Sequence, residues 1–135
     1  MEVTYKRRIN YYETDKMGVV HHANYLRYFE EARIYFLDEA GLSYKEIEAA
    51  GVIMPVLGVD ISYKASLDFD DILYLKTSLS YVKGTKAAFS YEGYNQDGKL
   101  VCKGTSTHGF VKKDFKPTIL KKDFPEIFEI LSKTV

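Results

Sequence analysis

The segment NYLRYFEEARIYFLDEA, residues 24–40, decides the fold because it is the longest helical pattern in the chain. Its apolar and aromatic side chains recur every three or four residues, which is the spacing of a helix face. They occupy two faces, so most of the circumference is apolar and we expect other elements to enclose the helix. One face carries Leu26, Phe29, Arg33, Phe36, Leu37 and Ala40, and the other carries Tyr25, Tyr28, Ala32 and Tyr35. Gly41 is the expected C-terminal stop of this helix.

Strand patterns lie on both sides of the helix. Residues 3–10 alternate apolar and charged side chains and predict a first strand. Four further strands are predicted at residues 53–65, 72–82, 87–95 and 100–111. Two shorter helices are predicted at residues 43–50, where Ser43 and Glu46 fit a capping box, and at residues 123–131, where Pro125 falls in the first turn.

The turns between the four later strands are short, which makes these strands antiparallel. Turn-forming residues lie at 68–71, at 83–84 and at 96–98. A sheet of five strands with one apolar helix on its face is an α+β sandwich. We expect the helix to approach the sheet most closely at the small residues Gly104, Thr105 and Ser106. One helix on one sheet leaves apolar surface uncovered, so a homo-oligomer is expected.

The composition excludes several functional classes. The chain has 135 residues, which fits a single domain over residues 1–135. Its 19 basic and 19 acidic side chains give a formal net charge of +0, which argues against a nucleic-acid binder. The single cysteine, Cys102, permits no internal disulfide, and no run of about 20 apolar residues is present to cross a membrane. These features favour a soluble protein of the reducing cytoplasm.

Residues 11–33 concentrate reactive side chains beside the start of the long helix. Asp15 lies in a loop that runs through Gly18 into a helix start at about His22–Asn24. The free backbone N–H groups of a helix start, together with the helix dipole, can hold an oxyanion. If Asp15 faces that end, an acyl carbonyl can bind the N–H groups while the carboxylate attacks it or activates water. The segment therefore indicates acyl transfer without serine, cysteine or metal, whereas the simpler interpretation of Asp15 is a turn residue.

Other polar residues of this segment have simpler interpretations. His21 and His22 point in different directions, and His108 is the only other histidine, so no metal site is expected. His22 is better suited to hydrogen bonding. Asn24 is expected to be the N-cap of the helix, with its side chain accepting a backbone N–H. A solvated stripe with a local ion pair accounts for Glu30, Glu31 and Arg33.

The same segment resembles a known family. It contains Tyr11-x-x-Thr14-Asp15-x-Met17-Gly18-Val19-Val20-x-His22-x-Asn24-Tyr25, followed by Tyr28-Phe29-Glu30 and Arg33. This run closely resembles the acyl-CoA thioesterases of the hotdog fold, and most of all the 4-hydroxybenzoyl-CoA thioesterase family and its YbgC-like branch. The order of the segments, the turn at 68–71 and the stretch from Gly104 to Lys116-Pro117 also resemble that family. The implied fold is a five-stranded antiparallel sheet wrapped around a long central helix.

The resemblance implies hydrolysis of an acyl-CoA thioester to a carboxylic acid and CoA, with no cofactor and no metal. It places the catalytic carboxylate at Asp15, as nucleophile or as general base. It places the carbonyl-polarising backbone amide at His22, whose side chain is a second candidate contributor. Around the substrate it places Gly18, Val20, Asn24 and Tyr25. Other hotdog thioesterases use a glutamate on the central helix, so Glu30 and Glu31 stay as an alternative.

The phosphates of coenzyme A require cations and backbone donors. The best candidate is the turn Lys83-Gly84-Thr85-Lys86, because family members commonly use basic residues near this hairpin. Residues 76–113 hold seven basic and two acidic side chains, and a local field of that sign attracts an anionic ligand. The simpler interpretation is a solvated β-turn.

The resemblance further implies that two subunits pair their sheets and build each active site between them, commonly as a dimer of dimers and hence a homotetramer. The family covers aromatic, short and longer acyl groups as well as acyl carrier protein, so the sequence leaves the acyl group open. Two other functions also stay open. One is a domain that binds acyl-CoA or acyl carrier protein without turnover, and the other is a hydratase, which needs a different His/Asp arrangement on the helix. Cys102 is expected to be an inert core residue.

Overall fold

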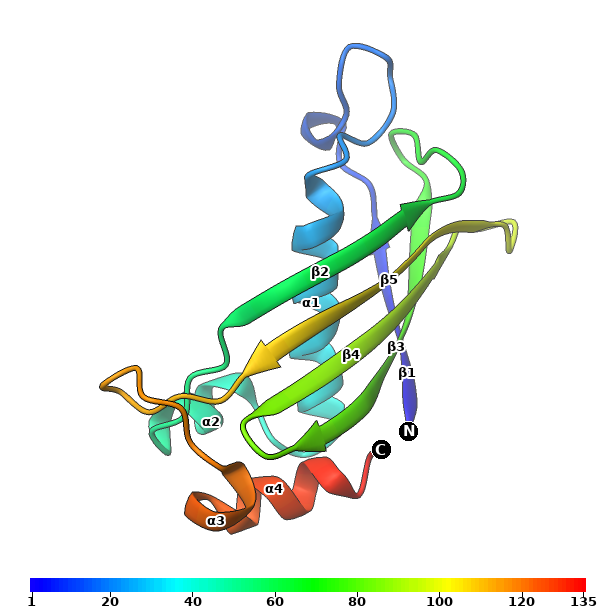
Figure 1. Cartoon of the computed structure of the whole chain (residues 1–135). Helices are drawn as coiled ribbons and strands as arrows, with labels where there is room; N and C mark the ends of the chain where they lie inside the picture. Colours follow the sequence, from blue (N-terminus) through cyan, green and yellow to red (C-terminus); the bar gives the residue numbers. More distant parts are fainter.

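A long helix lies against one face of a five-stranded antiparallel sheet in the computed structural model, which describes residues 1–135 (Figure 1). The helix is α1 (Asn24–Glu39). The strands are β1 (Glu2–Arg8), β2 (Val56–Tyr63), β3 (Ile72–Lys83), β4 (Lys86–Tyr94) and β5 (Leu100–Gly109). The shorter helices are the 3-10 helix η1 (Tyr11–Glu13), α2 (Tyr44–Ala49), α3 (Leu120–Asp123) and α4 (Pro125–Ser132). The predicted α+β class, the five strands and the long helix are confirmed.

Local sequence signals set the end of α1 and the start of α2 at the predicted residues. Gly41 follows α1 at φ 86°, in the left-handed region that glycine favours. At the start of α2 the Ser43 hydroxyl accepts a hydrogen bond of 3.1 Å from the backbone N–H of Glu46. The C-terminal helix predicted at 123–131 is confirmed as α4, with Pro125 in its first turn. The short helix α3 before it was not predicted, and Phe124 at φ −137° separates the two. None of the helices is long and apolar enough to cross a membrane.

The strand order is β1-β3-β4-β5-β2, so β1 and β2 form the two edges of the sheet. The strands β3, β4 and β5 follow one another through hairpins, as predicted. The expectation that a tight turn also joins β2 to β3 is wrong, because β2 pairs with β5 while β3 pairs with β1. A turn is present at 68–71, where the Asp71 carboxylate accepts the backbone N–H of Asp68 at 2.8 Å. The segment 64–71 nevertheless carries the chain from the edge strand β2 past β5 and β4 to β3, which lies beside the other edge strand, β1.

The buried face of α1 packs on the middle of the sheet. Phe29 stacks on Tyr91 of β4 with 4.0 Å between ring centroids. A side chain at Gly104 would place its Cβ 2.7 Å from Cε2 of Phe29 and 2.7 Å from the backbone oxygen of Asp60. The predicted site of closest approach between helix and sheet is therefore confirmed at Gly104. The residues of α1 that are buried are Tyr25, Tyr28, Phe29, Ala32, Phe36 and Leu37.

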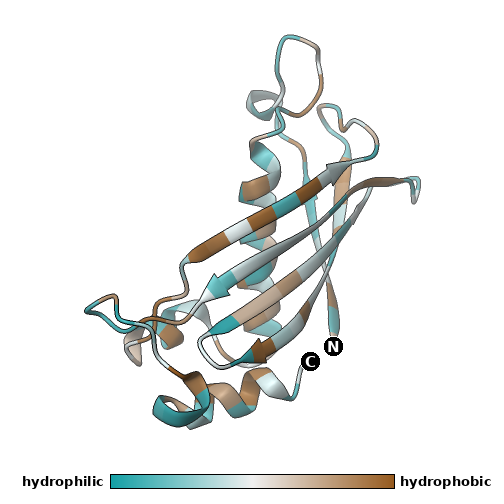
Figure 2. Cartoon of the chain, viewed as in Figure 1, coloured by the Kyte–Doolittle hydropathy of each residue, from teal (hydrophilic) through white to brown (hydrophobic).

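The opposite side of α1 is not enclosed, which corrects the expectation drawn from its two apolar faces. Leu26 is 47% exposed and Ile34 is 40% exposed, because the sheet of one chain covers only one side of the helix. The edge strand β2 is also apolar and open, and Figure 2 shows hydrophobic residues along it. Its exposed apolar side chains are Val56, Leu57, Val59 and Tyr63. One chain therefore leaves a helix side and a strand edge uncovered next to each other.

Candidate active site

Asp15 lies in a tight loop between η1 and α1. The loop is closed where Thr14 pairs with Val20, and the Asp15 backbone N–H donates to the Val19 carbonyl at 2.9 Å. Gly18 donates to the Asp15 carbonyl at 3.0 Å and has φ 80°, a conformation that glycine adopts without strain. These bonds fix the backbone on both sides of the Asp15 side chain.

The two carboxylate oxygens of Asp15 have different surroundings. Oδ1 accepts the backbone N–H of Met17 at 2.8 Å, which is the turn interaction expected of a loop aspartate. Oδ2 makes no hydrogen bond within the chain, and the residue is half-buried. One oxygen thus holds the turn while the other stays free for chemistry, so the two interpretations of Asp15 are compatible.

The start of α1 leaves one backbone donor open. The N–H groups of Asn24 and Tyr25 donate to the carbonyls of His21 and His22, at 3.0 and 3.3 Å. The Ala23 N–H donates to the His21 ring at 3.2 Å. The His22 N–H has no acceptor in the chain. It is a free donor at the positive end of a helix dipole, where a developing oxyanion is stabilised.

The prediction that Asn24 is the N-cap is wrong. Ala23 occupies the cap position and makes no side-chain cap bond. A tight turn at 21–23 already supplies carbonyls to the first N–H groups of the helix, so a side-chain cap has no donor left to satisfy. The Asn24 side chain points back and donates to the Glu13 carbonyl at 2.8 Å instead.

Asp15 and His22 open onto the same cleft, which has a volume of about 350 Å³. Val20 and Tyr25 also line it, so the structure brings together four of the predicted site residues. Burial raises the pKa of the Tyr25 phenol well above its ordinary value, so Tyr25 is a neutral wall. Asn24 lines a second, more open hollow that Asp15 shares. Gly18 shapes the loop but lines neither hollow.

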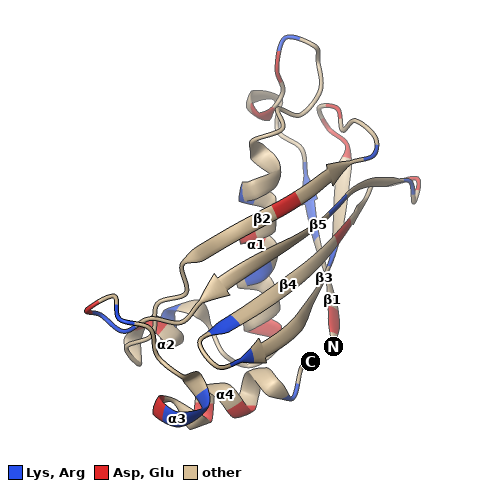
Figure 3. Cartoon of the chain, in the orientation of Figure 1, with Lys and Arg blue, Asp and Glu red and all other residues tan.

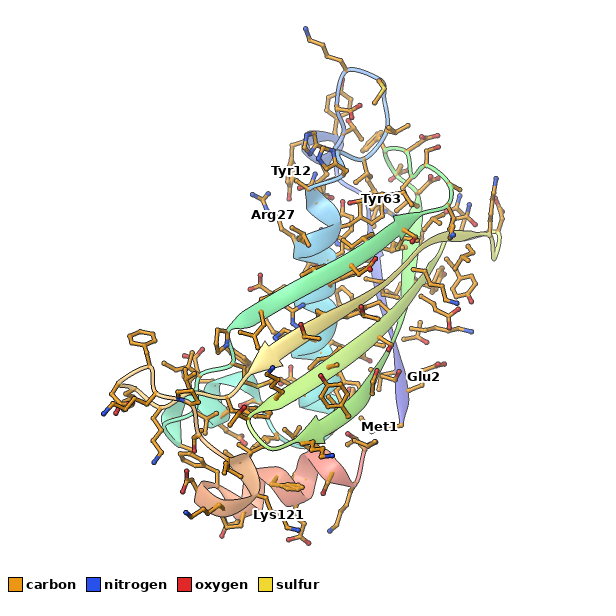
Figure 4. The ribbon with its side chains drawn as sticks, viewed as in Figure 1. Met1, Glu2, Tyr12, Arg27, Tyr63 and Lys121 are labelled. Atoms are coloured by element: carbon orange, nitrogen blue, oxygen red, sulfur yellow. The ribbon has the colours of Figure 1, made fainter.

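Sequence reasoning missed the far wall of this cleft. It comes from the end of β2 and the residues after it, Tyr63, Lys64, Ala65 and Ser66. The Tyr63 hydroxyl donates to the His22 carbonyl at 3.2 Å, and its ring meets the Tyr25 ring edge-on at 5.0 Å. Figure 4 shows Tyr63 with Tyr12 and Arg27 around the start of α1. No local signal marks Tyr63, because its role depends on a strand that follows His22 by about forty residues.

The basic turn at 83–86 does not reach this cleft in one chain. The Asp15 loop follows the end of β1, where Arg8 lies opposite Ile72 at the start of β3. Lys83 is at the other end of β3, opposite Lys86. At about 3.3 Å per residue the strand separates the two ends by roughly 36 Å. Figure 3 shows basic residues in blue at the β3–β4 hairpin, at the opposite end of the molecule from the loop that precedes α1. Lys83, Thr85 and Lys86 can serve this site only from another copy of the chain.

The two adjacent histidines form no metal-binding cluster. Their rings stack at 4.4 Å, and no group of three His, Cys, Asp or Glu side chains is arranged so that it could hold a metal ion. The cleft thus combines a carboxylate oxygen, a free N–H at a helix start and apolar walls. That set can polarise a carbonyl and direct a nucleophile at it.

Comparison with known proteins identifies the family of the chain. The family model described as the thioesterase-like superfamily matches residues 9–129. The putative acyl-CoA thioesterase YneP of Bacillus subtilis is 39% identical over 119 residues, which cover 87% of this chain and 86% of YneP. The acyl-CoA thioester hydrolase YbgC of Escherichia coli is 31% identical over 94 residues, 70% of each chain. The crystal structure of the DHNA-CoA thioesterase from Staphylococcus aureus has a TM-score of 0.93 at 34% identity, and covers 98% of this chain and 89% of that one. The resemblance carried by residues 11–33 is confirmed.

Proposed function

The chain belongs to the thioesterase-like superfamily and has the hotdog fold, and from this premise we propose that it hydrolyses the thioester of an acyl-CoA to a carboxylic acid and CoA. The observation that carries the proposal is the pairing of two unsatisfied groups on one cleft. These are the free Oδ2 of Asp15 and the free backbone N–H of His22. A thioester carbonyl bound at His22 would have its carbon open to attack from the Asp15 side.

The proposed chemistry begins with polarisation of the thioester carbonyl. The His22 N–H donates to the carbonyl oxygen, and the partial positive charge at the start of α1 stabilises the oxyanion as it forms. Asp15 then acts in one of two ways. As nucleophile, Oδ2 bonds to the carbonyl carbon, CoA leaves as thiolate, and water hydrolyses the resulting anhydride. As general base, Oδ2 takes a proton from a water whose oxygen attacks the same carbon, and the C–S bond then breaks so that CoA leaves as thiolate and takes up the proton.

A thiol-release assay with DTNB tests the proposed function. We expect release of free CoA from at least one member of a panel of aromatic, short-chain and long-chain acyl-CoA esters. The same panel on acyl carrier protein decides between the two carriers. Binding of acyl-CoA with no thiol released from any ester would contradict hydrolysis and favour a binding domain. An enoyl-CoA that gains water without releasing thiol would point to a hydratase.

We also propose that the active unit contains two chains joined at β2, and that two such pairs form a tetramer. The edge of β2 is open and apolar, and an unpaired edge is a template for pairing with another strand. A two-fold axis would pair β2 with its copy in antiparallel fashion, so the start of one β2 lies beside the end of the other. The end of β2 is the active-site wall, through Tyr63. Each cleft would therefore be completed by the opposite end of a second sheet.

In this arrangement the basic turn at 83–86 of one chain would lie near the cleft of the other. Val56, His108, Ala87 and Val82 form one row across the sheet, so the turn lies just beyond the row that starts with Val56. In the two-fold pair that row of the second copy comes level with Tyr63 of the first. The lysines of one chain would thus face the nucleotide of CoA bound to the other.

Replacing both Lys83 and Lys86 with glutamine is expected to raise KM for an acyl-CoA about 10-fold, since each lost phosphate contact costs a charge-assisted hydrogen bond. Turnover at saturation should stay close to wild type. The matched substrate is the same acyl group on pantetheine, which lacks the nucleotide and should show no change. Equal increases in KM for both esters would remove the phosphate-binding role.

We place the protein in the cytoplasm. Its one cysteine, Cys102, is a free and buried thiol, as is usual in a reducing compartment.

A further inference from the structure

The proposed chemistry leaves one buried carboxylate beside the site without a role. Glu13 is only 6% exposed, and it precedes Asp15 by two residues. The guanidinium of Arg7 donates from one nitrogen to both of its oxygens, at 2.7 and 2.9 Å. The backbone N–H of Asn10 donates to Oε1 at 2.8 Å. Glu13 is thus fixed by three charge-assisted hydrogen bonds.

Fixing this side chain also fixes the peptide that follows it. The Glu13 carbonyl accepts two hydrogen bonds, from the backbone N–H of His21 at 2.9 Å and from the Asn24 side chain at 2.8 Å. His21 and Asn24 stand on either side of His22. One carbonyl therefore links the strand-side end of the Asp15 loop to a residue on each side of the proposed oxyanion donor, the one directly before it and the one two positions after it.

Arg7 connects Glu13 to the sheet and to the central helix. It lies on β1, and besides Glu13 it bonds Glu31 of α1 at 2.9 Å and stacks over the Tyr28 ring at 4.3 Å. Burial alone would lower the pKa of Arg7, but the Glu13 hydrogen bond and the charges of Glu31 and Glu13 outweigh it and raise the pKa. Arg7 is thus a fixed cation that holds Glu13 against both the sheet and the central helix.

We propose that Glu13 is a positioning residue, which holds the carboxylate of Asp15 and the N–H of His22 at the separation that the reaction needs. This inference rests on the proposed function. Glu13 touches no substrate and moves no proton. It acts because a carboxylate on a flexible loop and a donor on a helix start must meet one carbonyl group, and a displacement of about 1 Å can cost about 100-fold in rate.

Glu13→Gln is the direct test. Glutamine keeps the shape but not the charge, so it cannot hold the guanidinium through both oxygens. We expect kcat to fall about 10- to 100-fold while KM for the acyl-CoA changes by less than about 2-fold. Asp123→Asn is the matched control, since Asp123 also bonds a cation and a hydroxyl, those of Lys112 and Thr118, but far from the site. It should lose comparable stability or less and keep wild-type kcat.

A double-mutant cycle separates positioning from a general loss of structure. If Glu13 acts through Asp15, then Glu13→Gln should lower kcat no further in a chain that already carries Asp15→Asn. Additive losses in the two backgrounds would overturn the inference. So would a wild-type kcat in Glu13→Gln.

Asn24→Ala decides the question if Glu13→Gln does not fold. It removes one of the two bonds to the Glu13 carbonyl and leaves the buried ion pair intact. We expect a smaller fall in kcat with KM again unchanged, and a wild-type kcat would overturn the inference. These outcomes differ from failure of the proposed function, in which the wild-type chain releases no thiol or Asp15→Asn retains full turnover.

Discussion

Asp15→Asn is expected to lower kcat about 10²- to 10⁴-fold, which is the contribution of a positioned base or nucleophile. The structure explains why the loss should be confined to chemistry. Asparagine keeps an oxygen to accept the Met17 N–H, so the turn that Oδ1 now holds at 2.8 Å survives. The charge on Oδ2 is lost, and with it the ability to attack a carbonyl or to take a proton from water. Turnover of a good substrate is measured by thiol release and the melting temperature by calorimetry.

Asp15→Ala provides the comparison for this prediction. Alanine removes the turn interaction as well as the charge, so the alanine variant should have the same kcat as the asparagine variant. Its free energy of unfolding should be lower by about 1 kcal/mol, and its melting temperature should fall accordingly. Turnover within a few-fold of wild type in Asp15→Asn would remove Asp15 from the mechanism. The alternative carboxylates on α1, Glu30 and Glu31, would then be the next to substitute.

Val59→Lys is expected to separate the proposed pair of chains and to lower activity about 100-fold with it. Val59 is 40% exposed at the middle of β2, so a two-fold axis through the paired edge places it close to its own copy. Two lysines at that position would repel each other and would have to leave water. Sedimentation or light scattering should then report a mass well below that of the wild type: one chain, 15.5 kDa, or two chains where the contact between pairs persists.

Val135→Lys is the matched control for the edge substitution. Val135 is 60% exposed and also apolar, but it follows α4, where the neighbouring Thr134 bonds the N-terminus, and it does not lie on β2. This variant should keep both the oligomeric state and the activity of wild type. A wild-type mass for Val59→Lys, or a single chain that retains full activity, would show that the second copy does not complete the site.

The local elements of this fold are predictable because each rests on neighbouring residues. The aromatic repeat of residues 24–40 produces α1, Gly41 ends it, and the alternating segments produce five strands. The loop that carries Asp15 is also predictable in outline, because Gly18 and the following helix pattern fix its two ends. What these features share is short range, since each depends on backbone preferences within about one turn of the chain.

The errors all concern interactions between distant residues. The turn at 68–71 forms as its residues require, but β2 and β3 on either side of it do not pair, because β2 pairs with β5, some forty residues later. Asn24 has the residue type of a cap, yet the Glu13 carbonyl competes for it. The two apolar faces of α1 predict that most of its circumference is enclosed, which a single sheet cannot supply.

The candidate site divides in the same way. Asp15, Val20, His22 and Tyr25 are close in sequence and lie on one cleft, so one segment places them. Tyr63 comes from a strand whose position in the sheet has no local signal, and it was missed. Glu13 could have been found, because Asn10 and Glu13 have the spacing of a capping box and precede the reactive loop.

The single thiol of Cys102 can report local opening of the sheet around β5. The side chain is fully buried in β5, and burial raises its pKa to about 12, so the reactive thiolate is both hidden and scarce while the sheet is closed. A disulfide reagent such as DTNB should therefore label the protein only when β5 separates from its neighbours. The labelling rate, followed without substrate, then measures how often this part of the sheet opens under native conditions. With substrate present, the fast thiol signal belongs to the released CoA alone.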